Sequence, residues 1–342
     1  MKISILIPCY NEEKTIRACI ESCLNQTRRA DEIIVVDDCS TDTTPPILWE
    51  FGNQIRVVRT SANRGKKSYA QEFGMAHVTG DVFITTDADT LLDSRFVEVM
   101  EERFKNAHTA AVAGYVKSLR HNWLTACREI DYLVAQKLHK KAASSLGAFF
   151  VIPGCAGAFR TALFKRIIAF EHDTMTEDLD FTYKFYEQGL AVEFAPDAIA
   201  YTQDPPTLSS SIRQVRRWHR GSWQNIWKHR DILMRPAHAF ELSMVYTESL
   251  FFPLTLFTMP ILNVIFMKIV ALYYILLIVL LGTWGAVASR RPDLLYHAPF
   301  YPIVSMINAY LFFEQLAALC LRKNGSIKWH KPDRLPIAGI AL

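Results

Sequence analysis

The sequence predicts an α/β fold in which a mostly parallel central sheet carries helices on both faces, followed by C-terminal interfacial and transmembrane helices. Three observations support this prediction. Short apolar runs alternate with helical patterns along the first part of the chain, as expected for strands joined by crossover helices. Acidic residues follow several of these runs, at the sheet edge where such folds bind ligands. Long apolar segments begin only after residue 240.

The apolar runs and helical patterns divide the first half of the chain into expected elements. Strands are expected at 3–7, 33–36, 55–58 and 82–85, and helices at 12–26, 43–51, 66–77, 123–143 and 177–188. Asn11 is a favourable N-cap for the first helix, which has acidic residues in its opening turn. Because Tyr10, Asp38 and Asp87 each follow an expected strand, we expect them to converge on one crevice.

Composition divides the chain into three parts. Hydrophobic residues make up 50% of the 342 residues and charged residues 21%. We expect a soluble catalytic domain at 1–235 with interfacial helices near 208–235, a membrane region at 240–322, and a basic cytoplasmic tail at 323–342. The N-terminal apolar run ends at Pro8 and is too short for a signal peptide, which predicts a cytoplasmic catalytic domain anchored in the cell membrane.

The expected membrane region contains two or three spans. Residues 269–288 carry no charged side chain and are long enough to cross a bilayer. Residues 298–321 form a second candidate, interrupted only by Glu314. A third segment, 242–267, contains two prolines and an acid, and is expected to be a kinked span or an interfacial helix.

Charge and cysteine content exclude other classes of protein. The net charge of +4 is small and the first domain has no basic stripe, so no nucleic-acid partner is expected. None of the seven cysteines forms a Cys-x-x-Cys pair, which predicts a reducing compartment without a disulfide framework. The first strand is followed by Pro8-Cys9-Tyr10-Asn11 instead of a glycine-rich turn, which argues against a nicotinamide-binding oxidoreductase.

The triplet Asp87-Ala88-Asp89 follows an expected strand and predicts a cation site. Carboxylate oxygens bind hard divalent cations, and such a cation offsets the charge that a diphosphate leaving group gains. One acid can hold a ribose while the other binds the metal. A triplet of this kind also occurs by chance in loops that are only capped or solvated.

Two further segments carry candidate nucleotide ligands. Asp37 and Asp38 follow the strand at 33–36, where a carboxylate can accept hydrogen bonds from a base or ribose. Asp42 is better explained as a residue that caps the next helix. A glycine beside cations at Asn63-Arg64-Gly65-Lys66-Lys67 could approach the nucleotide closely.

Two later motifs suggest transfer to an acceptor. Asp178, in Thr176-Glu177-Asp178, is a candidate general base that would take the proton of an attacking hydroxyl; its alternative is a first-turn acid favoured by the helix dipole. In Gln214-x-x-Arg217-Trp218, the indole can stack on a sugar, while the other two side chains hydrogen-bond to an acceptor or diphosphate. The surrounding basic and aromatic helix suits a membrane surface or, alternatively, simple solvation.

These motifs together resemble those of family 2 inverting membrane glycosyltransferases of the processive type, such as poly-N-acetylglucosamine, hyaluronan, chitin and cellulose synthases. The similar stretches lie within about 1–230, and they are Ile7 to Glu13, Asp37 to Ser40, Gly65-Lys66, Asp87 to Thr90, Gly154 to Arg160, Thr176 to Asp178 and Gln214 to Trp218. The family usually has glycine where this chain has Cys39. The resemblance implies a GT-A nucleotide-sugar-binding fold, a UDP-sugar donor, and Mg²⁺ or Mn²⁺.

The resemblance also implies a role for each candidate residue. Asp178 would be the catalytic base and Asp89 the metal ligand. Nucleotide-binding residues would be Pro8, Tyr10, Glu12, Asp38, Lys66 and Asp87, and residues binding acceptor or diphosphate would be Glu177, Gln214, Arg217 and Trp218. Expected partners are the donor, a saccharide or lipid-linked acceptor and membrane lipid. Because two or three spans are few for a polymer channel, a homo-oligomer or an accessory membrane subunit is a further candidate partner.

Two other functions remain as alternatives. A non-processive transferase acting on a polyprenyl phosphate or a glycolipid would share the donor site and the membrane anchor. Product size, polymer against single addition, distinguishes it from a synthase. A catalytically silent membrane scaffold would keep the fold as a binding module, although the intact acids of Asp37-Asp38, Asp87-Ala88-Asp89 and Glu177-Asp178 argue against it.

Overall fold

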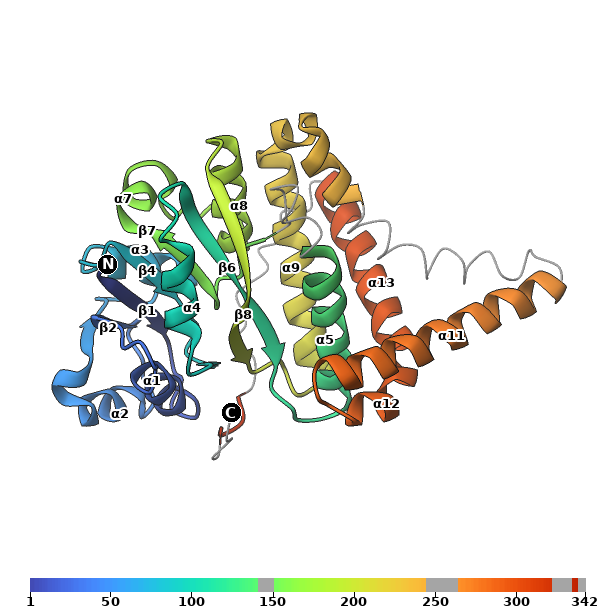
Figure 1. Ribbon diagram of the computed structural model, residues 1–342, viewed down its shortest axis with the longest axis horizontal. Helices are drawn as coiled ribbons and strands as arrows, with labels where there is room; N and C mark the ends of the chain where they lie inside the picture. Colours follow the sequence, from blue (N-terminus) through green and yellow to red (C-terminus); the bar gives the residue numbers. More distant parts are fainter. Residues whose placement is uncertain (141–150, 244–263, 322–333, 338–342) are drawn as a thin grey trace.

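The computed structural model describes residues 1–140, 151–243, 264–321 and 334–337. Its centre is an eight-stranded sheet in the order β3-β2-β1-β4-β7-β6-β8-β5 (Figure 1). The strands are β1 (Ile3–Cys9), β2 (Glu32–Asp37), β3 (Arg56–Arg59), β4 (Val82–Thr85), β5 (Thr90–Leu92), β6 (Thr109–Ser118), β7 (Gly157–Arg160) and β8 (Ala191–Thr202). The four strands expected from the sequence all form.

The sheet is mixed. Strands β3, β2, β1 and β4 are mutually parallel, whereas β7 runs antiparallel to both β4 and β6. Strand β8 pairs in parallel with β6 and antiparallel with β5. The expected α/β fold is therefore confirmed, and its parallel part is the half that the alternating pattern predicted.

Helices cover both faces of the sheet. They are α1 (Ile16–Leu24), α2 (Thr44–Glu50), α3 (Lys67–Met75), α4 (Phe96–Arg103), α5 (Trp123–Tyr132), α7 (Thr161–Leu163), α8 (Glu177–Glu187) and α9 (Leu208–Lys228). All seven side chains of β1 are buried, because its alternate residues belong to two different core clusters. Ile5 packs on the side of α1 and α4, and Leu6 on the side of α3 and α8. A strand buried on both faces explains the uninterrupted apolar run.

One local prediction was wrong, and another was right in part. Asn11 does not cap the first helix: Thr15 occupies the N-cap position, because the chain first makes a turn in which Glu12 O accepts the N–H groups of Thr15 and Ile16. Asn11 instead has a φ of 57°, and its Oδ1 accepts a hydrogen bond of 2.8 Å from Thr41 N. The long helix expected at 123–143 is α-helical only to Tyr132 and continues with π-helical turns over Leu133–Lys140; 141–143 lie outside the described residues.

Cys39 has a φ of 62°, in the left-handed region that favours glycine. We expect Cys39→Gly to raise the free energy of unfolding by about 0.5–1 kcal/mol, because the relief of left-handed strain exceeds the extra chain entropy of glycine. Thermal unfolding measures the gain. Cys39→Ala is the matched control, since it removes the thiol and keeps the strain. Equal stabilisation by both variants would contradict the explanation.

The C-terminal part is helical. It contains α11 (Val264–Ala288), α12 (Asp293–His297) and α13 (Tyr301–Cys320). Two stretches, Met267–Ala288 and Asp293–Cys320, are long and apolar enough to cross a membrane. The first contains the expected span at 269–288, and the second contains all but the last residue of the expected span at 298–321. Most of the third candidate, 242–267, lies outside the described residues.

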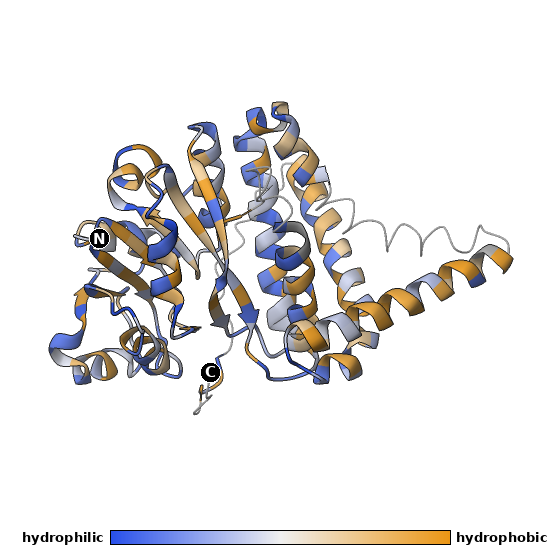
Figure 2. Cartoon of the chain, viewed as in Figure 1, coloured by the Kyte–Doolittle hydropathy of each residue, from blue (hydrophilic) through white to orange (hydrophobic). Residues whose placement is uncertain are grey.

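Helices α11 and α13 differ in what they contact. Helix α11 extends away from the sheet and presents a largely exposed apolar surface (Figures 1 and 2). Helix α13 lies along α9 and α5. Arg216 Nε of α9 lies 2.7 Å from Glu314 Oε2 of α13, and Trp223 Nε1 donates a 3.3 Å hydrogen bond to Phe312 O. Glu314, the single acid of α13, is thus paired with an arginine of α9.

Candidate active site

One cavity of about 590 Å³ lies at the carboxyl ends of β1, β2 and β4 and extends to α5, α9 and α13. Every residue to which the resemblance assigns a role lines it. The residues assigned to the nucleotide are Pro8, Tyr10, Glu12, Asp38, Lys66 and Asp87. Those assigned to the metal, to catalysis and to the acceptor or diphosphate are Asp89, Asp178, Glu177, Gln214, Arg217 and Trp218. The structure therefore brings together motifs that are more than 200 positions apart in the sequence.

The end of β2 places only one of its two acids in the cavity. Asp38 is buried, and its Oδ1 accepts a 2.7 Å hydrogen bond from Thr60 Oγ1. Burial raises the pKa of Asp38 above its ordinary value. Asp37 is held by Arg59 and by the N–H of Ser40 at 2.9 Å. Asp37 thus supports the loop, and Asp38 is the acid that a bound ligand can reach.

Lys66 lies at the cavity but already has carbonyl partners. Its ammonium group donates to His172 O and to Thr174 O. The neighbouring Lys67 forms an ion pair with Asp87 and lies 3.5 Å from Glu177 Oε1. Burial by itself would lower the pKa of Lys67, but the two acids raise it above its ordinary value. Lys67 is therefore the charged lysine that links Asp87 to the start of α8.

Asp89 is paired with a residue near the C-terminus. Its Oδ2 contacts the guanidinium of Arg334, which also lies 3.7 Å from Glu12 Oε2. Two hydrogen bonds of 2.9 and 3.0 Å between the Gln203 side chain and the main chain of Leu335 hold this segment in place. Burial raises the pKa of Asp89, and Arg334 opposes the rise. Residues 334–337 thus supply a positive charge to the carboxylate that the motif predicts to bind metal.

The acids of the triplet suit a divalent cation. Asp89 is buried and Asp87 is half-buried, so both offer hard oxygen ligands in a partly desolvated position. Both carboxylates are already paired with cationic groups, which shows that this end of the cavity accommodates positive charge. The donor set is the one that Mg²⁺ and Mn²⁺ prefer.

Asp178 lies in the first turn of α8, two residues after the N-cap residue Thr176. Burial raises its pKa to about 6, and the adjacent Glu177 adds to the rise, while Lys67 and Arg217 oppose it. Its Oδ1 accepts a 2.9 Å hydrogen bond from Leu179 N. A carboxylate with a pKa near neutrality is better matched to accepting a proton than an ordinary aspartate.

Helix α9 contributes the opposite wall of the cavity. Gln214, Arg217 and Trp218 fall on neighbouring turns of this helix. The side-chain carbonyl oxygen of Gln214 is buried without a hydrogen-bond partner among the described residues, as expected of an acceptor reserved for a ligand. The Arg128 guanidinium lies 5.2 Å from the centre of the Trp218 ring, so a cation already covers part of the indole.

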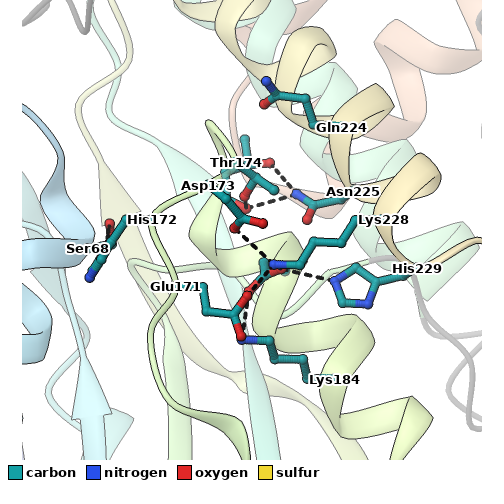
Figure 3. A network of polar contacts seen from close by, with 12 residues as sticks. Ser68, Glu171, His172, Asp173, Thr174, Lys184, Gln224, Asn225, Lys228 and His229 are labelled. Carbon is teal, nitrogen blue, oxygen red and sulfur yellow. Dashed lines mark hydrogen bonds and ion pairs between the residues drawn. The ribbon is translucent and has the colours of Figure 1, made fainter.

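A second group of acids, Glu171, Asp173 and Asp180, has oxygens within 4.8 Å of one another. This cluster is an ion-pair network, because Lys228 Nζ lies between 2.5 and 2.9 Å from all three acids (Figure 3). His229 also lies 3.0 Å from Asp180 Oδ1. The network joins the end of α9 to α8 and to the segment before it.

Sequence reasoning missed several residues that line the cavity. They are Arg128, Asp131, Tyr132, Lys140, Asp204, Tyr301 and Arg334. Asp204 could have been found, since it follows a strand just as Asp87 does. The others carry no local signal, because their roles depend on contacts between segments that are distant in sequence. Burial lowers the pKa of Lys140 to about 7.

Residues 4–166 match the family model described as Glycosyl transferase family 2. This part of the chain is a family 2 glycosyltransferase domain. The chain is 32% identical over 231 residues to the probable glycosyltransferase YdaM of Bacillus subtilis, covering 65% of this chain and 55% of that protein. It is 29% identical over 223 residues to the poly-beta-1,6-N-acetyl-D-glucosamine synthase of Staphylococcus epidermidis, covering 64% and 54%. The chain thus spans about half the length of these glycosyltransferase relatives.

Solved structures of similar fold support the GT-A assignment. The mannosyltransferase PcManGT from Pyrobaculum calidifontis, in complex with GDP-Man and Mn²⁺, has a TM-score of 0.58 at 19% identity, covering 88% of this chain and 87% of that chain. Residues 1–349 of S. aureus TarS, in complex with UDP-GlcNAc, have a TM-score of 0.51 at 19% identity, covering 94% and 92%. At this level of identity the likeness establishes the fold of the glycosyltransferase domain.

Proposed function

We propose that this protein is a membrane-bound inverting glycosyltransferase that moves a sugar from a UDP-sugar to a growing β-linked polysaccharide, for example of N-acetylglucosamine or glucose. The observation that carries the proposal is the single cavity lined by the acids that follow β2 and β4, by Asp178 and by the Gln-x-x-Arg-Trp helix. A relative named as a poly-N-acetylglucosamine synthase and a neighbour bound to UDP-GlcNAc favour this donor and product.

The donor would occupy the end of the cavity nearest the sheet. Asp38 and Asp87 would hold the nucleoside, with Pro8, Tyr10, Glu12 and Lys66 around it. Asp89 would hold Mg²⁺ or Mn²⁺, which when bound offsets the negative charge that develops on the departing UDP. The Mn²⁺ complex of the Pyrobaculum neighbour is consistent with a divalent cation here.

The transfer step would use Asp178 as general base. The acceptor hydroxyl oxygen attacks the anomeric carbon from the face opposite the diphosphate, a new glycosidic bond forms, and the bond to the UDP oxygen breaks. The proton of the hydroxyl passes to the Asp178 carboxylate, and the electron pair of the broken bond leaves with UDP. Attack from the opposite face inverts the configuration at that carbon.

The acceptor would lie between α9 and the C-terminal helices. Gln214, Arg217 and Glu177 offer hydrogen bonds, and Trp218 offers an aromatic surface. Tyr301 of α13 also lines the cavity, so a helix apolar enough to cross a membrane forms part of the proposed acceptor wall. This arrangement suits an acceptor that leaves along the membrane, as a lengthening glycan or a lipid-linked saccharide.

The size of the product tests this proposal. Membranes containing the protein would be incubated with radiolabelled UDP-sugars, and the products separated by size. A ladder or a high-molecular-weight product from one UDP-sugar is expected. A single addition to a polyprenyl phosphate or a glycolipid would identify the alternative, a non-processive transferase. Absence of UDP release with every donor would contradict both functions and favour a catalytically silent scaffold.

The membrane arrangement is part of the same proposal. Residues 1–235 would lie in the cytoplasm, 240–322 would include two or three spans of the cell membrane, and 323–342 would return to the cytoplasm. A homo-oligomer or an accessory membrane subunit is part of the proposal as a partner in export of the product. Protease protection of sealed vesicles distinguishes this orientation from the opposite one.

Arg334 competes with a metal ion for the Asp89 carboxylate, which leads to a prediction about cation binding. We expect Arg334→Ala to tighten binding of Mn²⁺ in the absence of nucleotide by about tenfold, since an opposed unit charge in a partly buried site is worth more than about 1 kcal/mol. Isothermal titration measures the affinity. Arg29→Ala, which removes an exposed arginine outside the cavity, is the control. An unchanged or weaker affinity in Arg334→Ala would contradict the competition.

A further inference from the structure

Helix α9 contacts the segment before Asp178 along one continuous face. The residues involved are Arg217, Gly221, Gln224, Asn225 and Lys228. They are spaced by three, four or seven positions along the helix, which places them on one side of it. The same face therefore carries Arg217 of the Gln-x-x-Arg-Trp motif at one end and the lysine of the acidic network at the other.

Asn225 binds the residue that begins helix α8. Its side chain is fully buried, and its Nδ2 donates hydrogen bonds of 3.0 Å to both Thr176 O and Thr176 Oγ1. Thr176 is the N-cap residue of α8, and it makes no side-chain hydrogen bond to that helix. The position of Thr176 is therefore fixed by another helix, and Asp178 follows it by two residues.

Gly221 lies one turn before Asn225 and allows the close approach. A Cβ atom at this position would overlap with the hydroxyl, the methyl group and the Cβ of Thr176. Any larger residue would push Thr176, and with it the start of α8, away from α9. The glycine therefore sets the separation of the two helices at the level of the candidate base.

The main chain of Met175 is held on both sides. Gln224 Oε1 accepts a 3.0 Å hydrogen bond from Met175 N, and Arg217 Nη1 donates one of 3.4 Å to Met175 O. Beyond it, Lys228 binds Asp173 and Asp180, so Asn225 and Lys228 both point from α9 toward this segment (Figure 3). The connection before α8 thus contacts α9 through Glu171, Asp173, Met175 and Thr176.

From these contacts we infer that Gly221 and Asn225 are positioning residues for sugar transfer, which hold the carboxylate of Asp178 at a fixed place relative to the acceptor-binding residues of α9. The inference rests on the proposed function, since it presumes that Asp178 accepts the proton of the acceptor. Helix α9 then fixes the positions of both Asp178 and the acceptor-binding residues. Displacing reacting groups by about 1 Å can cost about a hundredfold in rate.

The first test compares turnover with binding. We expect Asn225→Ala and Gly221→Ala to lower kcat by about 10–100-fold, while the affinity for UDP stays within about twofold, because the nucleotide is held from the other side of the cavity. Trp227→Ala, an exposed residue of the same helix, should leave both quantities unchanged. Unaltered kcat in both positioning variants would overturn the inference.

The second test separates positioning from loss of structure. Thr176→Ala removes the two side-chain atoms that a Cβ at position 221 would meet most closely, so adding it to Gly221→Ala should restore part of the lost kcat. Gln224→Glu, which keeps an acceptor oxygen for Met175 N, should retain more activity than Gln224→Leu. Thermal unfolding shows which variants fold. A double variant whose kcat is no higher than that of Gly221→Ala would contradict a steric contact between position 221 and Thr176 as the cause.

A third measurement uses the pH profile of the folded variants. The groups that face Asp178 are Glu177 on its own helix, Lys67 on α3, Arg217 on α9, and Lys140 and Cys155 on the remaining walls. Moving the carboxylate changes its distance from these charges, so the pH midpoint of kcat should shift in Asn225→Ala. A lower kcat with an unchanged midpoint would indicate general destabilisation and overturn the inference. If the wild-type protein transfers no sugar, the proposed function fails instead.

Discussion

Asp178→Asn is expected to lower kcat by about 10²–10⁴-fold, the usual contribution of a general base. The amide keeps the size of the side chain but cannot take up the proton of the acceptor hydroxyl. Binding of UDP should remain nearly intact, because the nucleotide is held by Asp38, Asp87 and the residues around them. Steady-state transfer assays combined with titration of UDP measure the two effects separately.

The assignment of Asp178 as the base can also be contradicted by the nucleotide affinity of this variant. Asp231→Asn, at an exposed position outside the cavity, is the matched control and should behave as wild type. If Asp178→Asn lost nucleotide affinity together with turnover, Asp178 would be part of the donor site and its assignment as the base would be wrong.

The pH dependence of turnover follows from the raised pKa of Asp178. Because burial raises that pKa to about 6, the base is protonated and inactive below this pH and ionised above it. We expect kcat to rise with pH through about 6 and to level off above neutrality. A profile that is flat between pH 5 and pH 7 would show that another group accepts the proton.

The second large effect is expected at the cation site. Asp89→Ala should weaken binding of Mn²⁺ at least about tenfold, the lower end of the cost of disturbing a metal site, and should abolish the part of UDP binding that depends on the metal. The reason is the loss of a buried carboxylate oxygen, which water cannot replace as a charged ligand. Titrations of UDP with and without Mn²⁺ measure the difference.

Asp197→Ala is the control for this variant, since Asp197 is an exposed acid on β8. It removes one negative charge outside the cavity. If long-range electrostatics were the cause, the affinity for Mn²⁺ would fall in both variants. Metal dependence that persists unchanged in Asp89→Ala would refute the assignment of Asp89 as the ligand.

The parallel half of the fold could be predicted because its information is local. A strand buried on both faces needs an unbroken apolar run, and the residues after it must reach the sheet edge. Asp38 and Asp87 were found in this way. Strands β6, β7 and β8 lacked such a signal, because their partners lie far along the chain and their side chains are small or mixed.

The rest of the site could not be predicted because it depends on which pairs of side chains meet in the folded chain. Lys66 and Lys67 look alike in the sequence, yet only Lys67 reaches Asp87, since α3 begins there and turns the two side chains in different directions. Arg334 reaches Asp89 across about 245 positions of sequence. The sequence also gave no reason to expect that Asn225 binds the residue capping α8. Such contacts become visible only when the helices are placed in space.

The most direct test of the central claim is a crystal structure with UDP and Mn²⁺ in which the anomalous signal of manganese is mapped. We predict one peak beside the Asp89 carboxylate, with the nucleotide between it and Asp38 and with Asp178 and Trp218 facing the open end of the cavity. A manganese peak at Glu171, Asp173 and Asp180, or UDP bound elsewhere on the protein, would contradict the account.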